Sequence, residues 1–117
     1  RDFCYVANAV QANLLAATTV NPEADNTVYN VALDDRTSLT QLFALLRDVL
    51  AETRPAVAAL KPLHRDFRAG DVRHSQADIS KARRLLGYEP THRLDEGIRV
   101  AMPWYIDRFL SRDVCGA

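Results

Sequence analysis

The pattern of hydrophobic positions predicts helices in the first half of the chain. Residues 8–19 are rich in Ala and Leu, with Val10, Leu14 and Ala17 at helical spacing. A second helix is predicted over residues 39–53, where Ser38 and Gln41 form a capping box. Its wide apolar stripe is expected to face a core. The stripe consists of Leu39, Leu42, Phe43, Leu46, Val49 and Leu50.

Two further helices are predicted in the second half. A short helix begins near Asp78, which is a typical N-cap, and ends at Gly87, a typical C-cap. The last helix covers residues 94–110, and Pro103 is expected to kink it or to make it start afresh. Its expected buried stripe is Leu94, Ile98, Ala101, Tyr105 and Phe109, and we interpret the Trp104–Tyr105 pair as core rather than as a stacking platform.

Three short segments have the pattern of strands. Residues 1–6 and 63–67 are expected to be short strands. Thr27–Leu33 is almost continuously apolar, as in a strand that is covered on both faces of a parallel sheet. The predicted fold class is therefore α/β (α+β as an isolated fragment), mainly helical with short strands.

Arginines surround a glycine ahead of the short helix. Arg65, Arg68 and Arg73 lie in a run that also contains Gly70 and Asp71. The guanidinium group donates paired hydrogen bonds that fit phosphate oxygens, and glycine lets the backbone come close to a ligand. The pattern is that of an anion clamp, and a solvated basic face is the alternative.

These residues also carry a family resemblance. The run R-x-G-D (residues 68–71), followed by A-D-x-S-K-A-x-x-L-L-G-Y-x-P (residues 77–90), resembles the C-terminal signature of the extended short-chain dehydrogenase/reductase family. R-D-F-C-Y-V at residues 1–6 and V-Y-N-V at residues 28–31 resemble two other motifs of that family. Within it the chain is most similar to NAD-dependent UDP-sugar 4-epimerases. A-M-P-W-Y-I at residues 101–106 resembles the subgroup that acts on UDP-N-acetylhexosamines.

The resemblance implies a domain organisation. Residues 1–110 would be the C-terminal substrate-binding domain, including the last strand of the parallel cofactor sheet, and residues 111–117 a tail. Because the chain starts inside a family motif, we expect a fragment of a longer enzyme whose NAD-binding domain lies upstream.

The resemblance also implies a binding site for a UDP-sugar. Arg1 and Arg68 match the arginines that contact the nucleotide diphosphate, and Asp71 matches the Asp near the uridine ribose. Gly70 would allow close approach of the ligand. Asn8 stands where many relatives carry an Asp, a position that is more often structural.

Parts needed for catalysis are missing from the sequence. The glycines are Gly70, Gly87, Gly97 and Gly116, which form no dinucleotide-binding fingerprint. No Tyr is followed four residues later by Lys, the catalytic pair of the family. We therefore expect no catalytic or cofactor-binding residue here, no retained NAD, and no activity of this chain alone.

In the full-length enzyme, the resemblance implies that NAD takes hydride from C4 of the sugar and returns it to the other face. A 4,6-dehydratase or decarboxylase of the same family, which would share Arg1 and Arg68, remains open. So does a non-catalytic anion or nucleic-acid binding module, although 15 basic and 15 acidic residues give no net charge to attract nucleic acid.

The composition also bears on whether the chain is a membrane protein, a disulfide-linked protein or a metal-binding protein. No apolar run is long enough to span a membrane, and Cys4 (expected to be buried) and Cys115 (expected to be a free thiol) are consistent with a cytoplasmic protein. His64, His74 and His92 have no metal-site spacing and are expected to face solvent. Asp2, Asp66 and Asp71 are further acidic candidates for a carboxylate pair.

The predicted strand Thr27–Leu33 also bears on assembly. Without its neighbour it would expose unpaired N–H and C=O groups that another copy can pair with. We expect a homodimer or larger assembly, with an interface above about 1,000 Å² that includes this strand or the first helix.

Overall fold

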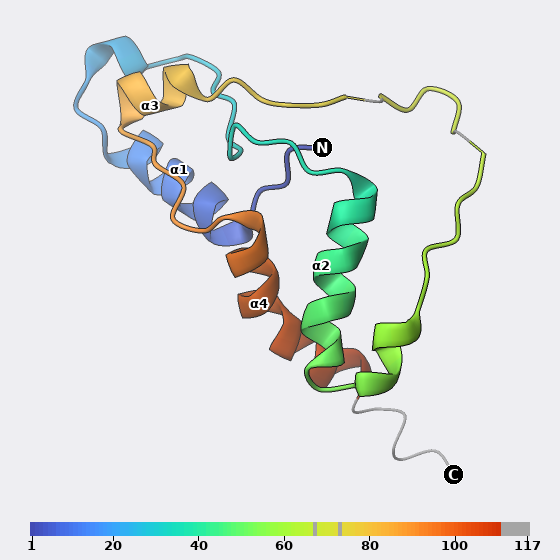
Figure 1. Ribbon diagram of the computed structural model, residues 1–117. Coiled ribbons are helices and arrows are strands. Elements are labelled where there is room, and N and C mark those ends of the chain that lie inside the picture. Colours follow the sequence, from blue (N-terminus) through green and yellow to red (C-terminus); the bar gives the residue numbers. More distant parts are fainter. Residues whose placement is uncertain (67, 73, 111–117) are drawn as a thin grey trace.

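The computed structural model describes residues 1–66, 68–72 and 74–110. Its α-helices are α1 (Val6–Thr18), α2 (Leu39–Ala51), α3 (Ser80–Leu86) and α4 (Leu94–Tyr105). The 3₁₀ helices η1 (Pro22–Ala24) and η2 (Pro55–Ala59) and a π-helical segment, η3 (Ile106–Leu110), complete the regular structure. In Figure 1, α1 and α3 lie at one end, α4 meets α2 at the other, and the described residues between 60 and 78 form a long arc along the outside.

The mainly helical part of the predicted fold class is confirmed, but the strands are not. Within the described residues no segment is assigned to a strand, so the strands predicted at residues 1–6 and 27–33 are wrong for this chain. The strand predicted at residues 63–67 is not formed over 63–66, and residue 67 lies outside the described residues. A strand needs a neighbour to complete its hydrogen-bond ladder. Around Thr27–Leu33 the side chains alternate: Val28 is 88% exposed, whereas Tyr29 and Val31 pack against the core.

The core lies between α1, α3 and the segment that precedes α2. Ile79 and Tyr88 are fully buried, and Ala12, Ala32 and Ala82 complete the cluster. The Tyr88 hydroxyl donates a hydrogen bond to the Ala32 carbonyl oxygen (2.9 Å). Burial raises the pKa of this phenol well above its ordinary value.

The predicted helix ends are largely confirmed. Ser38 and Gln41 form the expected capping box, and α3 ends at Gly87, whose φ of 68° is left-handed. Asp78 acts one residue earlier than predicted: its Oδ1 accepts from the Ser80 N–H (2.8 Å) ahead of the formal N-cap, Ile79. Hydrogen bonds from the side chain and backbone of Ser80 lower the pKa of Asp78.

The apolar positions of the first two helices are only partly buried, so the prediction that the whole apolar stripe of the second helix faces a core is wrong in part. On α1 the buried residues are Asn8 and Ala12, while Val10, Leu14 and Ala17 are exposed. On α2 Val49 is buried, whereas Leu39 and Leu46 are exposed. The sequence marks an apolar face but cannot tell which part of it finds a partner inside this chain.

The end of α4 differs most from expectation. Trp104 and Tyr105 are more than half exposed, as is Phe109, so the prediction that this pair is core is wrong. Their rings contact one another instead, with Trp104 and Tyr105 edge to face at 5.0 Å. Met102 is the buried residue here, and the π-helical turn begins three residues after Pro103.

Candidate functional site

The motif residues 68–71 form a tight turn. The Asp71 N–H donates to the Arg68 carbonyl oxygen (3.2 Å), and Gly70, the third residue of the turn, has a φ of 79°. This position of a type II turn requires a positive φ, which explains the glycine. A Cβ at Gly70 would meet no atom within 4 Å, so the space beside the turn is open.

Arg1 reaches this turn from the other end of the sequence. Its guanidinium group contacts the Asp71 carboxylate and the Val72 carbonyl oxygen. Its backbone is paired with Thr37 in both directions, at 2.8 and 2.9 Å. Two of the predicted site residues, Arg1 and Asp71, are therefore in direct contact.

A polar groove with a volume of about 460 Å³ lies beside this contact. It is lined by Arg1, Arg36, Thr37, Ser38, Leu39, Gln41, Asp71, Val72 and His74. Arg36 and His74 are lining residues that the sequence did not single out for the clamp. Ser38 and Gln41 are engaged in capping α2, so the basic side chains of the groove are those of Arg1 and Arg36. Guanidinium groups of this kind can donate hydrogen bonds to an anion.

The other clamp residues are placed differently. Arg68 is exposed and is not among the residues that line the groove. Arg65 lines a separate groove next to Phe43, with Lys61 and His64. Arg73 lies outside the described residues. The structure thus brings together Arg1 and Asp71 but not Arg65 and Arg68.

Two polar residues near the N-terminus, Asp2 and Asn8 of α1, join segments that are distant in sequence. The Asp2 carboxylate accepts hydrogen bonds from the backbone N–H groups of Leu33, Asp35 and Ala77. The fully buried Asn8 accepts from the N–H groups of Thr91 and His92 and donates to the His92 carbonyl oxygen. The structural interpretation of Asn8 is confirmed, and its amide supplies a donor that a carboxylate lacks.

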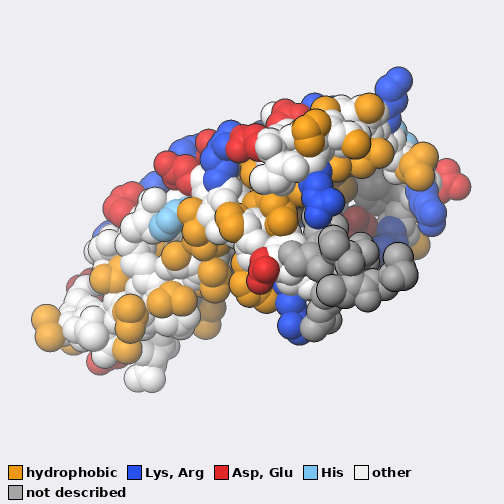
Figure 2. All heavy atoms as spheres, turned by 90° about the horizontal axis from the view of Figure 1, so that it is seen from below, with side chains coloured by type: hydrophobic (Ala, Val, Ile, Leu, Met, Phe, Trp, Pro, Cys, Tyr) orange, Lys and Arg blue, Asp and Glu red, His pale blue; other side chains and the backbone are white. Residues whose placement is uncertain are grey.

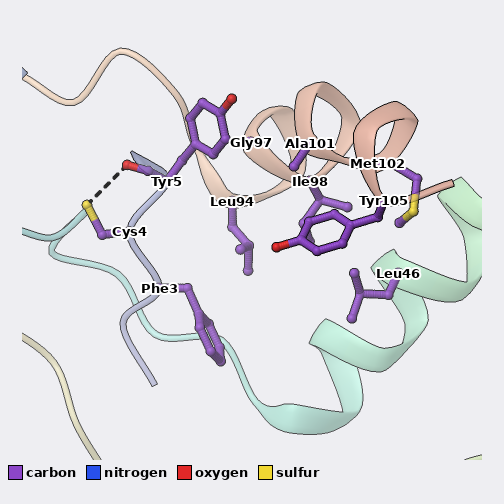
Figure 3. Close-up of a pocket in the computed structure, with 10 residues that line it drawn as sticks. All are labelled: Phe3, Cys4, Tyr5, Leu46, Leu94, Gly97, Ile98, Ala101, Met102 and Tyr105. Carbon is purple, nitrogen blue, oxygen red and sulfur yellow. Dashed lines mark hydrogen bonds between the residues drawn. The ribbon is translucent and has the colours of Figure 1, made fainter. Parts of the chain in front are cut away.

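A second, apolar pocket lies between the N-terminal segment, α2 and α4 (Figure 3). Its ten lining residues include Tyr5, Leu46 and Ile98, and its volume is about 230 Å³. Gly97 permits the close approach of α4 to the first segment, because a Cβ there would lie 2.7 Å from the Tyr5 Cβ.

Cys4 lines this pocket but is exposed, contrary to expectation. Its thiol lies 3.6 Å from the Tyr5 carbonyl oxygen. Partial burial raises the pKa of the Cys4 thiol, which lowers the fraction of reactive thiolate near neutral pH. Cys115 lies outside the described residues.

The remaining candidate residues form no metal centre in the part of the chain that the structure describes. There, no three His, Cys, Asp or Glu side chains gather as a metal site. His92 packs against the Tyr5 ring, with a centroid distance of 5.0 Å. No described helix is long and apolar enough to cross a membrane.

Known proteins resemble this chain in sequence and in structure, although no family model matches it. A UDP-glucuronate 4-epimerase of Arabidopsis thaliana is 30% identical over 91% of this chain, which covers 26% of the plant protein. A putative UDP-glucose 4-epimerase of Methanocaldococcus jannaschii is 32% identical over 89% of the chain and 30% of its own length.

A solved structure agrees with these sequence matches. The UDP-glucose 4-epimerase of Thermotoga maritima, crystallised with UDP-glucose, superposes with a TM-score of 0.79 at 34% identity. The match covers 92% of this chain and 31% of the bacterial enzyme. The chain is therefore similar, over about nine-tenths of its length, to a part of UDP-sugar 4-epimerases that makes up between a quarter and a third of those proteins.

Proposed function

We propose that the chain is the UDP-sugar-binding part of a nucleotide-sugar 4-epimerase. The observation that carries this proposal is the contact between Arg1 and Asp71, which joins two motifs 70 residues apart beside a groove that Arg1 and Arg36 line. Similarity to the epimerases named above supports the same assignment.

Arg1 has donors to spare for a ligand. A guanidinium group carries five N–H donors, and two of those of Arg1 are directed at Asp71 and Val72. The other three can reach a diphosphate while the ion pair persists. Arg1 contacts Oδ1 of Asp71, and Oδ2 can accept a hydrogen bond from a ribose hydroxyl.

Arg68 is the second proposed diphosphate ligand. It stands at the start of the turn that ends at Asp71, and its side chain is exposed. A ligand held by Arg1 and Asp71 would lie beside this turn, where the side chain of Arg68 can move toward it. Gly70 is proposed to keep the intervening space open.

The activity of the whole enzyme is part of the proposal. NAD would accept hydride from C4 of the sugar and return it to the opposite face, with the cofactor and the catalytic base held by an NAD-binding domain outside this chain. UDP-N-acetylglucosamine and its galacto epimer are the proposed sugars, on the basis of A-M-P-W-Y-I at residues 101–106. A cytoplasmic enzyme fits this chemistry.

The exposed surface supports association with a further domain or a second copy. The accessible surface is 8898 Å², whereas a compact protein of 13.1 kDa is expected to expose about 6,400 Å². Hydrophobic side chains are spread over the face shown in Figure 2, and Val6, Val10, Leu14 and Val28 are exposed. A homodimer or larger assembly through α1 or residues 27–33 is therefore proposed.

Product analysis tests the proposed reaction. A longer protein that contains this chain and an NAD-binding domain should convert UDP-N-acetylglucosamine to its galacto epimer, whereas the 117-residue chain alone should not. A 4-keto-6-deoxy sugar as the product would contradict the 4-epimerase assignment in favour of a dehydratase. Release of CO₂ with formation of a pentose, when UDP-glucuronate is supplied instead, would contradict it in favour of a decarboxylase.

A further inference from the structure

Asp2 joins three parts of the chain that are distant in sequence. Its Oδ1 accepts from the Leu33 N–H (3.0 Å), and its Oδ2 accepts from the N–H groups of Asp35 (3.3 Å) and Ala77 (3.2 Å). The half-buried carboxylate of Asp2 thus links its own N-terminal segment to the loop before α2 and to the end of the outer arc.

Asp2 and its partners lie near, in sequence, to the two residues that meet at the groove. Arg1 directly precedes Asp2 and pairs its backbone with Thr37, two residues beyond Asp35. Asp71 lies six residues before Ala77 on the same arc. Asp2 therefore ties the segment that carries Arg1 to the segment that carries Asp71.

A second link runs parallel to the first. The Gln76 side-chain amide donates to the backbone and carboxylate oxygens of Asp34, at 3.1 and 3.0 Å. Asp34 has a positive φ of 57°, an unusual conformation that its hydrogen-bonded surroundings hold in place. The loop before α2 and the arc are thus joined at consecutive residues, with Asp2 linking both to Arg1.

We propose that Asp2 is a positioning residue of the nucleotide site: it holds Arg1 opposite Asp71 so that both can engage the diphosphate and ribose of a UDP-sugar. The inference rests on the proposed function, because the ligand is the one proposed above. The Asp2 carboxylate accepts hydrogen bonds from backbone N–H groups of the protein, so in this role it does not need to contact the ligand.

The role requires a carboxylate. An ionised Asp only accepts hydrogen bonds, so both of its oxygens suit N–H donors. An Asn at this position would turn its NH₂ group either toward Leu33 or toward Asp35 and Ala77. At least one of the three N–H groups would lose its acceptor and face another donor.

The test compares Asp2→Asn with Asp25→Asn, a matched exposed position on the loop after η1. NMR of the 117-residue protein gives three readouts. The first is the Arg1 Nε–H resonance, which the Arg1→Lys variant assigns. The second is the rate of amide hydrogen exchange at Leu33, Asp35 and Ala77, and the third is the affinity for UDP. In Asp2→Asn the Arg1 resonance should shift, exchange at these amides should accelerate, and UDP should bind about tenfold more weakly, as expected for a lost charge-assisted contact. Asp25→Asn should behave like the unchanged protein.

The outcomes separate the inference from the proposed function. If UDP binds the unchanged protein and Asp2→Asn equally well, with the Arg1 resonance in place, the positioning role is overturned while the nucleotide site stands. If the unchanged protein shows no UDP binding, the proposed site itself is contradicted and the inference is overturned with it.

A second variant guards against loss of folding. Should Asp2→Asn lose its helical circular dichroism, Asp2→Glu takes its place, since it keeps the charge and both oxygens but moves them by one methylene. A shifted Arg1 resonance with partly weakened UDP binding is then expected, and wild-type values for both would overturn the inference.

Discussion

The buried junction of α1 and α3 and the outer arc, the described part of residues 60–78, hold their residues by different means. At the junction, Ile79 and Tyr88 are fully buried and apolar packing fixes the backbone. Along the arc, whose course Figure 1 shows, nearly every described residue is exposed. Polar contacts to Arg1, Asp2 and Asp34 hold its end. The proposed ligand-binding residues Arg68, Gly70 and Asp71 all belong to the arc.

This contrast indicates that stability and ligand binding depend on different parts of the chain. A packed junction tolerates little change, whereas an exposed loop can present charged groups without burying them. Substitutions in the junction should therefore change the free energy of unfolding, and substitutions in the arc should change affinity while leaving stability nearly untouched.

The largest effect is expected from Ile79→Ala. Removing a fully buried side chain of this size should lower the free energy of unfolding by about 2–5 kcal/mol, since a cavity remains. Val28→Ala, at an exposed position, should change it by less than about 0.5 kcal/mol. Urea unfolding of both variants checks this, and equal losses would remove the distinction between buried and exposed positions.

A change in the arc should act on affinity instead. In a full-length enzyme, Arg68→Ala should raise the KM for the UDP-sugar through a loss of about 1.5–3 kcal/mol of binding energy, and Arg68→Lys should recover only part of it. The unfolding midpoint of the isolated chain should not change. An unaltered KM in Arg68→Ala would exclude this residue from the site.

Gly97→Ala tests the close contact between α4 and the N-terminal segment. The new methyl group would lie 2.7 Å from the Tyr5 Cβ, which cannot swing away as the tip of a long side chain could. The expected cost is about 1–3 kcal/mol of stability, despite the higher helix propensity of Ala. A more stable variant in thermal unfolding would show that this contact is absent in solution.

Tyr88→Phe should have the smallest effect at neutral pH, about 1 kcal/mol for the lost bond to Ala32. Because burial raises the pKa of Tyr88 above its ordinary 10.0, the unfolded chain loses this proton first. The contribution of Tyr88 to the free energy of unfolding is therefore fully present below about pH 10, and it decreases as the pH rises further. Unfolding measured from pH 8 to 11 in a Cys4→Ser background should show this fall when Tyr88 is present but not in the Tyr88→Phe variant, and parallel curves would contradict it.

Local signals in the sequence predicted the helices well. The Ser38–Gln41 capping box and the glycine at position 87 mark helix ends through short-range chemistry, and both are confirmed. Tertiary partners could not be predicted in this way. Thr27–Leu33 has the composition of a strand, but a strand forms only when another strand lies beside it.

The site was predicted in part, and entirely through motifs. Arg1 and Asp71 were named as site residues, and their contact brings the two motifs together, while their roles toward a ligand stay predictions. Asp2 was considered only for a carboxylate pair, since its backbone partners lie 31 to 75 residues away and leave no local signal. Arg36 and His74 join the groove for the same reason: only the folded chain places them there.

Titration of the 117-residue protein with UDP and with uridine, followed by amide NMR, tests the central claim most directly. UDP should shift the signals of Thr37, Gly70, Asp71 and Val72, and uridine, which lacks the diphosphate, should shift them far less. Equal shifts with both ligands, or UDP-induced shifts confined to the buried junction around Tyr88, would contradict an Arg1–Asp71 nucleotide site.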